Sequence, residues 1–159
     1  KMILYHGSNI VVAQPKLNQQ NRFLNFCYVF YTTTNKDEAI SFADKVFRRR
    51  KEGDRVVSIY ELDEEAAFTA CSVLKFDAPN ADWLDFVSEN RSGIYKGARY
   101  DFVFGPVAND DVYTTFTLYT AGILTRDQTL AALKVKKLYN QLVITSEQAL
   151  KYLTFVGTL

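Results

Sequence analysis

The chain reads Tyr5-His6-Gly7-Ser8 near its start and Leu138-Tyr139-Asn140-Gln141-Leu142-Val143-Ile144 near its end. Between them stands Phe30-Tyr31-Thr32-Thr33-Thr34-Asn35-Lys36. Short runs of apolar, aromatic and β-branched residues are typical of strands. The sequence therefore predicts strands over Met2 to Tyr5, Val29 to Thr34 and Gln141 to Ile144.

The composition is that of an ordinary soluble domain: 159 residues, 48% hydrophobic and 23% charged, with a net charge of +1. We expect residues 1–159 to form a single domain. The aromatic content of 14% is enough to fill a core and to line a ligand slot. The net charge does not by itself indicate a nucleic-acid or membrane partner. Cys27 and Cys71 make no disulfide framework, and no membrane span or signal peptide is evident, so we expect a cytoplasmic protein.

A helix is predicted directly after the second strand. Asn35 is a helix-capping residue, and Glu38 stands where a capping box places its reciprocal partner. The apolar positions of this segment fall on one helical face, formed by Ala39, Ala43, Val46 and Phe47. The basic run Arg48 to Lys51 suits the last turns of a helix, and Gly53 is expected to end it.

The rest of the chain mixes strands and helices without strict alternation. Further strands are expected over Val56 to Leu62, Ser72 to Phe76, and Tyr100 to Val107, the last broken by Gly105-Pro106. Helices are expected over Asp82 to Ser88, from the capping box at Thr125 and Gln128 to Leu133, and after a cap at Thr145 and Gln148, the last carrying Ala149, Leu150 and Leu153. This order indicates an α+β fold rather than a doubly wound sheet.

Few residues indicate chemistry when each is taken alone. His6 is the only histidine and is typical of a strand-end residue satisfied by backbone. One histidine cannot build a His-rich metal site and no Cys/His spacing suggests zinc, so no metal is expected. No Gly-x-Ser-x-Gly stretch is present, which disfavours a serine hydrolase. Alone, Tyr31 reads as a core aromatic residue and Gln141 as a polar strand-entry residue. The run Arg48 to Lys51 reads as a solvated helix end or, alternatively, as a phosphate-contact patch.

Taken in order, the three stretches resemble the signature strands of the ADP-ribosyltransferase superfamily. In poly(ADP-ribose) polymerases and related bacterial toxins, the first strand carries His-Gly-Ser or His-Gly-Thr, the second carries Gly-x-Tyr and leads into a helix, and a late strand carries a Glu within Tyr-Asn-Glu. Two further segments, Trp83 to Phe86 and Tyr100 to Asp110, resemble an uncharacterised bacterial branch of that superfamily. The resemblance covers most of the chain and implies split mixed β-sheets, flanking helices and a central NAD cleft.

The resemblance also implies roles for individual residues. His6 would hydrogen-bond the adenosine-side ribose of NAD, Gly7 would hold the nicotinamide amide through its backbone, and Tyr31 would stack on the nicotinamide ring. Gln141 would meet the 2′-hydroxyl of the nicotinamide ribose. The implied catalytic residues are thus His6, Tyr31 and Gln141, and the implied NAD-binding residues are Gly7, Ser8, Phe30 and Phe42. Gly7 is also expected to let a ligand approach the backbone closely.

Two positions depart from the pattern. Val29 stands where the bacterial branch has a glycine, and Gln141 stands where the family has a glutamate. Gln141 keeps hydrogen-bonding capacity but carries no charge and cannot act as a general base. Loss of one well-placed electrostatic group costs on the order of 100–1000-fold in rate, which favours single ADP-ribose transfer or slow turnover. Asp110 and Asp111 are candidates for the base, and otherwise form a solvated turn or a helix start.

The resemblance implies an NAD-dependent mono-ADP-ribosyltransferase, for example a bacterial toxin or phage-defence effector. Its acceptor would be a protein, RNA or DNA, and an antitoxin or other partner protein is compatible with such a role. The alternative is a degenerate member of the fold that binds NAD, ADP-ribose or a partner without catalysis. An RNA 2′-phosphotransferase, which also uses NAD, is disfavoured because that family relies on several histidine and basic residues.

Overall fold

The computed structural model describes residues 1–17, 29–92, 94–107, 110–134 and 139–159. Within these ranges it contains strands and helices in the order β1 (Met2–Ser8), β2 (Phe30–Thr33), α1 (Lys36–Arg50), β3 (Val56–Leu62), α2 (Glu64–Ala70), β4 (Val73–Lys75), α3 (Ala81–Arg91), β5 (Phe102–Val107), α4 (Asp110–Thr120), α5 (Arg126–Lys134), β6 (Tyr139–Ile144), α6 (Glu147–Leu150) and β7 (Leu153–Thr158). The protein is therefore an α+β protein, as the interspersed pattern predicts.

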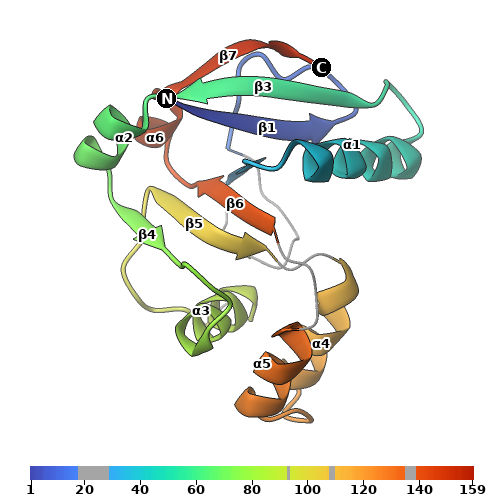
Figure 1. Ribbon diagram of the computed structural model, residues 1–159, viewed down its shortest axis with the longest axis vertical. Coiled ribbons are helices and arrows are strands. Elements are labelled where there is room, and N and C mark those ends of the chain that lie inside the picture. Colours follow the sequence, from blue (N-terminus) through green and yellow to red (C-terminus); the bar gives the residue numbers. More distant parts are fainter. Residues whose placement is uncertain (18–28, 93, 108–109, 135–138) are drawn as a thin grey trace.

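The strands form one mixed seven-stranded sheet in the order β4-β5-β6-β2-β1-β3-β7. Only β4 and β5 pair in parallel, and every other described pair is antiparallel. In Figure 1, β1, β3 and β7 lie side by side above α1, while β4, β5 and β6 run below them at an angle. The two groups of strands meet at β2.

The junction between the two groups is narrow. β1 pairs with β3 along its whole length, from Met2 to Ser8, but its described pairing with β2 is the single pair Tyr5–Thr33. A continuous antiparallel ladder would next bring His6 opposite Thr32, and then Gly7 opposite Tyr31. The described residues contain neither pair, so β1 and β2 diverge after Tyr5.

Three apolar clusters hold the helices on the sheet. Because side chains alternate along a strand, the register places Tyr31 and Val143 on one face and Phe30 and Leu142 on the other. The first face packs against α3, α4 and α5 through Trp83, Leu84, Val87, Phe116 and Leu133. The opposite face packs against α2 and α6 through Ala67 and Ala149. α1 packs on β1 and β3 through Ala39, Ala43 and Val57.

α1 begins as the sequence predicts. Asn35 is its N-cap and accepts a hydrogen bond from the Glu38 backbone N–H at 2.9 Å. The predicted end of the helix is wrong by a few residues. The C-cap with left-handed backbone is Lys51, with φ of 57°, and Gly53 lies beyond it in the following turn.

Gly53 serves that turn rather than the helix. It has φ of +77°, and a Cβ there would stand 2.2 Å from the Asn9 carbonyl oxygen. Both facts require glycine at this position. The turn is therefore built against the residue that follows β1.

The predicted break in the fifth strand is wrong. β5 runs through Gly105 and Pro106, which pair with Gln141 and Asn140 of β6. The parallel partner β4 ends at Lys75, opposite Phe104, so Pro106 lies past the end of that neighbour. A proline is tolerated where no strand needs its missing N–H.

The C-terminal prediction is wrong in two respects. α6 is capped by Ser146, whose hydroxyl accepts from the Ala149 N–H at 3.1 Å, whereas the Thr145 hydroxyl donates to the Tyr100 carbonyl. Leu153 does not belong to the helix but begins β7, where it pairs with Leu62.

α2, α4 and β7 were not predicted. By contrast, the capping box of α5 forms in both directions, at 2.9 Å from Thr125 N–H to Gln128 and 3.1 Å in return.

Candidate functional site

His6 spans the point where β1 and β2 diverge. Its Nδ1 lies 2.7 Å from the Tyr31 carbonyl oxygen. A carbonyl only accepts, so Nδ1 carries a proton and donates this hydrogen bond. The ring also stacks on Phe30, with centroids 4.4 Å apart and an interplanar angle of 29°. His6 thus joins the two strands by a side chain where a ladder would otherwise use backbone.

Gly7 is required by close packing. A Cβ at this position would stand 2.2 Å from the Ala39 carbonyl oxygen and 2.7 Å from the Ala43 nitrogen. Both atoms belong to the backbone of α1, which cannot move aside as a flexible side chain can. The close approach expected at Gly7 is therefore made, on its Cβ side, by a helix of the protein itself.

Ser8 and Asn9 connect the end of β1 to the end of α1. The Ser8 hydroxyl is buried and donates to Asn9 Oδ1 at 3.4 Å, a long hydrogen bond. Asn9 also donates from Nδ2 to the Glu52 carbonyl at 3.2 Å and accepts from Arg50 Nη1 at 2.9 Å. The turn after α1 is fixed by the same residue, because the Asp54 N–H donates to the Asn9 carbonyl at 2.9 Å.

The two aromatic residues of β2 are both in the core. Tyr31 is 5% exposed and packs in the cluster of Trp83 and Val143. Phe30 is 3% exposed and lies on the opposite face, between His6 and Tyr60. Tyr60 is fully buried, donates to the Val12 carbonyl at 2.6 Å, and has its pKa raised to about 12 because burial disfavours the phenolate.

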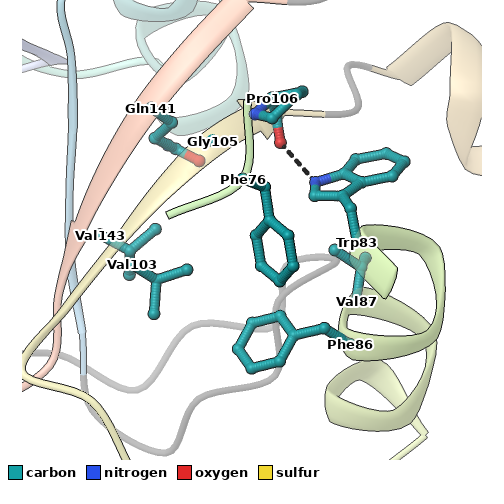
Figure 2. Close-up of a pocket in the computed structure, with 9 residues that line it drawn as sticks. All are labelled: Phe76, Trp83, Phe86, Val87, Val103, Gly105, Pro106, Gln141 and Val143. Atoms are coloured by element: carbon teal, nitrogen blue, oxygen red, sulfur yellow. Dashed lines mark hydrogen bonds between the residues drawn. The ribbon is translucent and has the colours of Figure 1, made fainter. Parts of the chain in front are cut away.

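Gln141 lies on β6, between Thr33 of β2 and Gly105 of β5. Its side chain enters a small pocket under α3, shown in Figure 2, whose volume of about 10 Å³ gives room for about one water molecule. The pocket is lined by Phe76, Trp83, Phe86, Val87, Val103, Gly105, Pro106, Gln141 and Val143. Oε1 of Gln141 is buried and has no hydrogen-bond partner in the described structure.

The wall of this pocket is fixed by Trp83. Its indole Nε1 donates to the Pro106 carbonyl at 2.9 Å, which ties α3 to β5 (Figure 2). Gly105 gives the room, because a Cβ there would come within 3.0 Å of the Phe76 Cβ. Sequence reasoning did not connect Trp83 or Phe76 with Gln141. The available signal was the Gly-Pro pair, which stands opposite Gln141 once β5 and β6 are paired.

The structure brings the predicted residues onto three neighbouring strands but not onto one face. Tyr5 pairs with Thr33, and Thr33 pairs with Gln141, so Tyr31 and Gln141 share a face. His6 follows Tyr5 and therefore lies on the opposite face, with Phe30 and Ser8. The link between the faces is the hydrogen bond from His6 to the Tyr31 carbonyl.

The remaining candidates lie around this junction. Phe42 is half-buried on α1, the helix that packs on Gly7. Asp110 and Asp111 open α4, and their side chains lie outside the described residues, as does Cys27. Within the described ranges, no group of three or more His, Cys, Asp or Glu side chains is placed to hold a metal ion. In the same ranges, no helix combines the length and apolarity needed to cross a bilayer.

Residues 2–155 match a family described as "Protein of unknown function (DUF3990)". The chain belongs to this family. The match runs from β1 into the first half of β7, so the signature stretches and the Trp83 pocket all fall within the DUF3990 region. No significant match was found among curated proteins or among solved structures.

Proposed function

We propose that this DUF3990 protein is an NAD-dependent mono-ADP-ribosyltransferase, which transfers ADP-ribose from NAD to a macromolecular acceptor and releases nicotinamide. The observation that carries the proposal is the adjacency of β1, β2 and β6 in the sheet. These strands carry His6, Tyr31 and Gln141, the three residues that the resemblance assigns to catalysis. They come from the two ends of the chain, so sequence order alone does not bring them together.

The end of the β1–β2 ladder supports the same assignment. The described pairing stops at Tyr5–Thr33, two residues before Gly7 would face Tyr31. Those two residues are the ones assigned to hold the nicotinamide amide and ring. In this proposal, the nicotinamide half of NAD lies along the divergence of the two strands. The ribose beyond it reaches toward Gln141 on one side and the adenosine half toward His6 on the other.

The chemistry of the step limits what each residue contributes. Breaking the nicotinamide–ribose bond generates positive charge on the sugar, as in glycoside cleavage. The electron pair of that bond leaves with nicotinamide. An acceptor oxygen or nitrogen bonds the anomeric carbon and gives up its proton to water or to a carboxylate, for which Asp110 and Asp111 are the candidates. Gln141 Oε1 can accept a hydrogen bond from the ribose 2′-hydroxyl, but it is neutral and cannot take the acceptor proton. Turnover is therefore expected to be slow.

The test is transfer of label from NAD carrying a radiolabelled adenylate phosphate. The purified protein is incubated with this NAD and bacterial lysate, and protein is then separated from RNA and DNA. We expect label in one macromolecular fraction, lost in His6→Ala, with Trp83 fluorescence confirming that the variant is folded. Gln141→Glu introduces the carboxylate that ADP-ribosyltransferases carry at this position. It should raise NAD hydrolysis by about 10-fold or more, as one recovered electrostatic group would.

Gln148→Glu is the matched control, because it makes the same change at an exposed position of α6. It should leave hydrolysis unchanged. Absence of NAD binding by the wild-type protein would refute the assignment of the site. Equal rates of NAD hydrolysis by the Gln141→Glu and Gln148→Glu variants would show that Gln141 does not contact the ribose.

The second candidate is a member of the fold that binds NAD or a partner without catalysis. Two observations favour it: Gln141 carries no charge, and the Tyr31 side chain is 5% exposed among core residues. NAD binding without label transfer or nicotinamide release, in the wild-type and Gln141→Glu proteins alike, would select this alternative.

A further inference from the structure

The C-terminal end of α1 carries a concentration of positive charge that the candidate NAD site does not use. Six cations and three carboxylates fall within residues 44–55, a local excess of three positive charges, whereas the whole chain carries +1. The four basic residues from Arg48 to Lys51 are all exposed. We call Arg49, Arg50 and Lys51 the basic end of α1.

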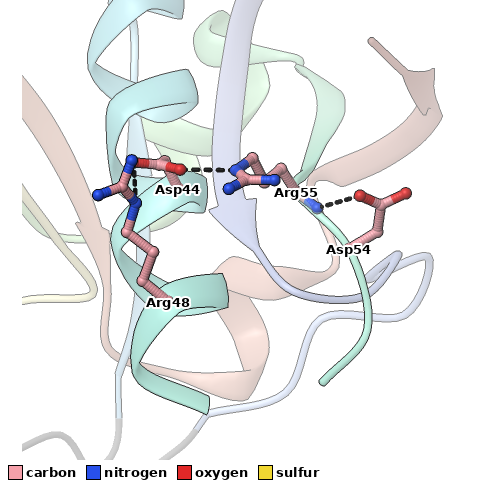
Figure 3. A network of polar contacts seen from close by, with 4 residues as sticks. All are labelled: Asp44, Arg48, Asp54 and Arg55. Carbon is pink, nitrogen blue, oxygen red and sulfur yellow. Dashed lines mark hydrogen bonds and ion pairs between the residues drawn. The ribbon is translucent and has the colours of Figure 1, made fainter. Parts of the chain in front are cut away.

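Part of this charge is neutralised within the protein. Figure 3 shows Asp44 between two guanidinium groups, with Arg55 Nε at 2.6 Å and Arg48 Nε at 3.0 Å. The hydrogen bond from Arg55, with that from Arg48, lowers the pKa of the Asp44 carboxyl. Asp54 forms no ion pair with the basic end among the described residues, and its Oδ1 accepts from the Arg55 backbone N–H at 2.7 Å.

The three residues of the basic end have no carboxylate partner among the described residues. Arg50 is held by a neutral acceptor, Asn9 Oδ1, so its position is fixed and its charge is not cancelled. A helix C-terminus carries about half a negative charge, which favours cations there but cancels less than one of the three positive charges. A net positive surface therefore remains at this end of α1.

The basic end lies close to the candidate site. Arg50 contacts Asn9, which follows β1, and His6 is three residues back along the chain. At about 3.3 Å per residue of extended chain, roughly 10 Å separates Asn9 from His6. Guanidinium groups match the geometry of phosphate oxygens through paired N–H donors, and two of the three residues are arginines.

We propose that the basic end of α1 binds the phosphodiester backbone of a nucleic acid and presents it to the candidate site as the acceptor. The acceptor assignment rests on the proposed function, whereas the binding surface does not. RNA and DNA share this chemistry, and the experiment separates them. An acidic protein would be recognised by charge alone, without the geometry of phosphate.

The surface is tested by binding without NAD. Fluorescence anisotropy is measured with a labelled 20-nucleotide single-stranded RNA, with DNA of the same sequence, and with labelled polyglutamate, each between 50 and 500 mM salt. The test variant combines Arg49→Gln with Lys51→Gly, which removes two charges, leaves Arg50 on Asn9, and suits the left-handed backbone at position 51. The control combines Lys36→Gln with Lys96→Gln, at exposed positions away from the basic end.

Counterion release gives the expected size of the effect. Each neutralised phosphate of a single strand contributes about 0.7 to the slope of log affinity against log salt. The test variant should lower that slope by about 1.4, and binding at 50 mM salt should weaken on the order of 50-fold if the lines meet near 1 M. The control variant should bind as the wild type does.

Several results would overturn the proposal. The protein could fail to bind either RNA or DNA, the wild type and the test variant could have equal salt slopes, or polyglutamate could bind as tightly as the nucleic acids do. Label transferred from NAD to protein but not to nucleic acid would overturn the acceptor assignment. Nucleic-acid binding with the expected slope, in a protein that transfers no label at all, would instead reject the proposed function and leave the binding surface standing.

Discussion

Replacement of Gln141 by methionine tests whether this residue is kept for function rather than for stability. Methionine has a similar length, fills an irregular apolar pocket and has no strong acceptor to satisfy. Gln141 Oε1 is buried without a hydrogen-bond donor in a pocket walled by Phe76, Trp83 and Val143. We expect Gln141→Met to stabilise the fold and, if the proposed function holds, to weaken NAD binding.

The magnitude follows from the cost of an unsatisfied group. A buried acceptor without a donor costs about 1–3 kcal/mol. Methionine also removes any stabilising contact of the Gln141 amide Nε2, which reduces the gain from removing Oε1. We therefore expect the free energy of unfolding to rise by about 1 kcal/mol. For a chain of this size, that corresponds to an increase in Tm of about 2–4 °C.

The assay is urea denaturation followed by tryptophan fluorescence. Trp83 is the only tryptophan and lines the same pocket, so one signal reports both global unfolding and the local environment. Gln148→Met is the matched control, because Gln148 is exposed on α6. It should change the free energy of unfolding by less than about 0.5 kcal/mol. NAD affinity is measured on the same three proteins.

A clear loss of stability in Gln141→Met, by about 1 kcal/mol or more, would refute the reasoning. It would mean that Oε1 accepts a hydrogen bond in solution, from bound water or from a neighbouring group. Higher stability with unchanged NAD affinity would keep the structural argument and remove Gln141 from the proposed site.

Three further predictions concern stability. Gly7→Ala should destabilise the fold by about 1–3 kcal/mol or more, because its Cβ would overlap the α1 backbone at Ala39; urea denaturation with a wild-type midpoint would contradict this. Tyr60 has a folded-state pKa of about 12, above its unfolded value of about 10. The contribution of this pKa shift to the free energy of unfolding is therefore complete below about pH 10 and is lost as the pH rises toward about 12. The loss is about 1.4 kcal/mol by pH 11, and Tyr60→Phe should abolish that part of the pH dependence; an unchanged pH profile would argue against it. Lys51→Gly alone should raise the free energy of unfolding by about 0.5 kcal/mol by relieving left-handed backbone, and a lower Tm would count against that strain.

Local patterns in the sequence predicted the elements whose signals are local. The Asn35 cap of α1 and the capping box at Thr125 and Gln128 form because each needs only residues three apart. β3 has the predicted bounds, Val56–Leu62. The predicted ends failed where a distant residue decides them. Thr145 does not cap α6 because its hydroxyl bonds the Tyr100 carbonyl of another segment.

The candidate site shows the same limit. Order along the chain predicted that His6, Tyr31 and Gln141 lie on three strands, and the structure makes those strands neighbours. Pairing register, which depends on contacts between distant segments, decides which way each side chain points. It placed His6 on the other face from Tyr31 and Gln141, and it brought Gly105 opposite Gln141. Neither result follows from composition or periodicity.

The register also constrains how NAD would bind. A ligand that touches both His6 and Gln141 must meet both faces of the sheet, and a continuous β1–β2 ladder would prevent this. The described ladder stops at Tyr5–Thr33, and beyond it the His6 imidazole holds the Tyr31 carbonyl. NAD would therefore compete with, or lie beside, that hydrogen bond. A variant that loses it should bind NAD more weakly through disorder of β2 as well as through loss of the histidine contact, so His6→Ala must be read together with the Gln141 variants.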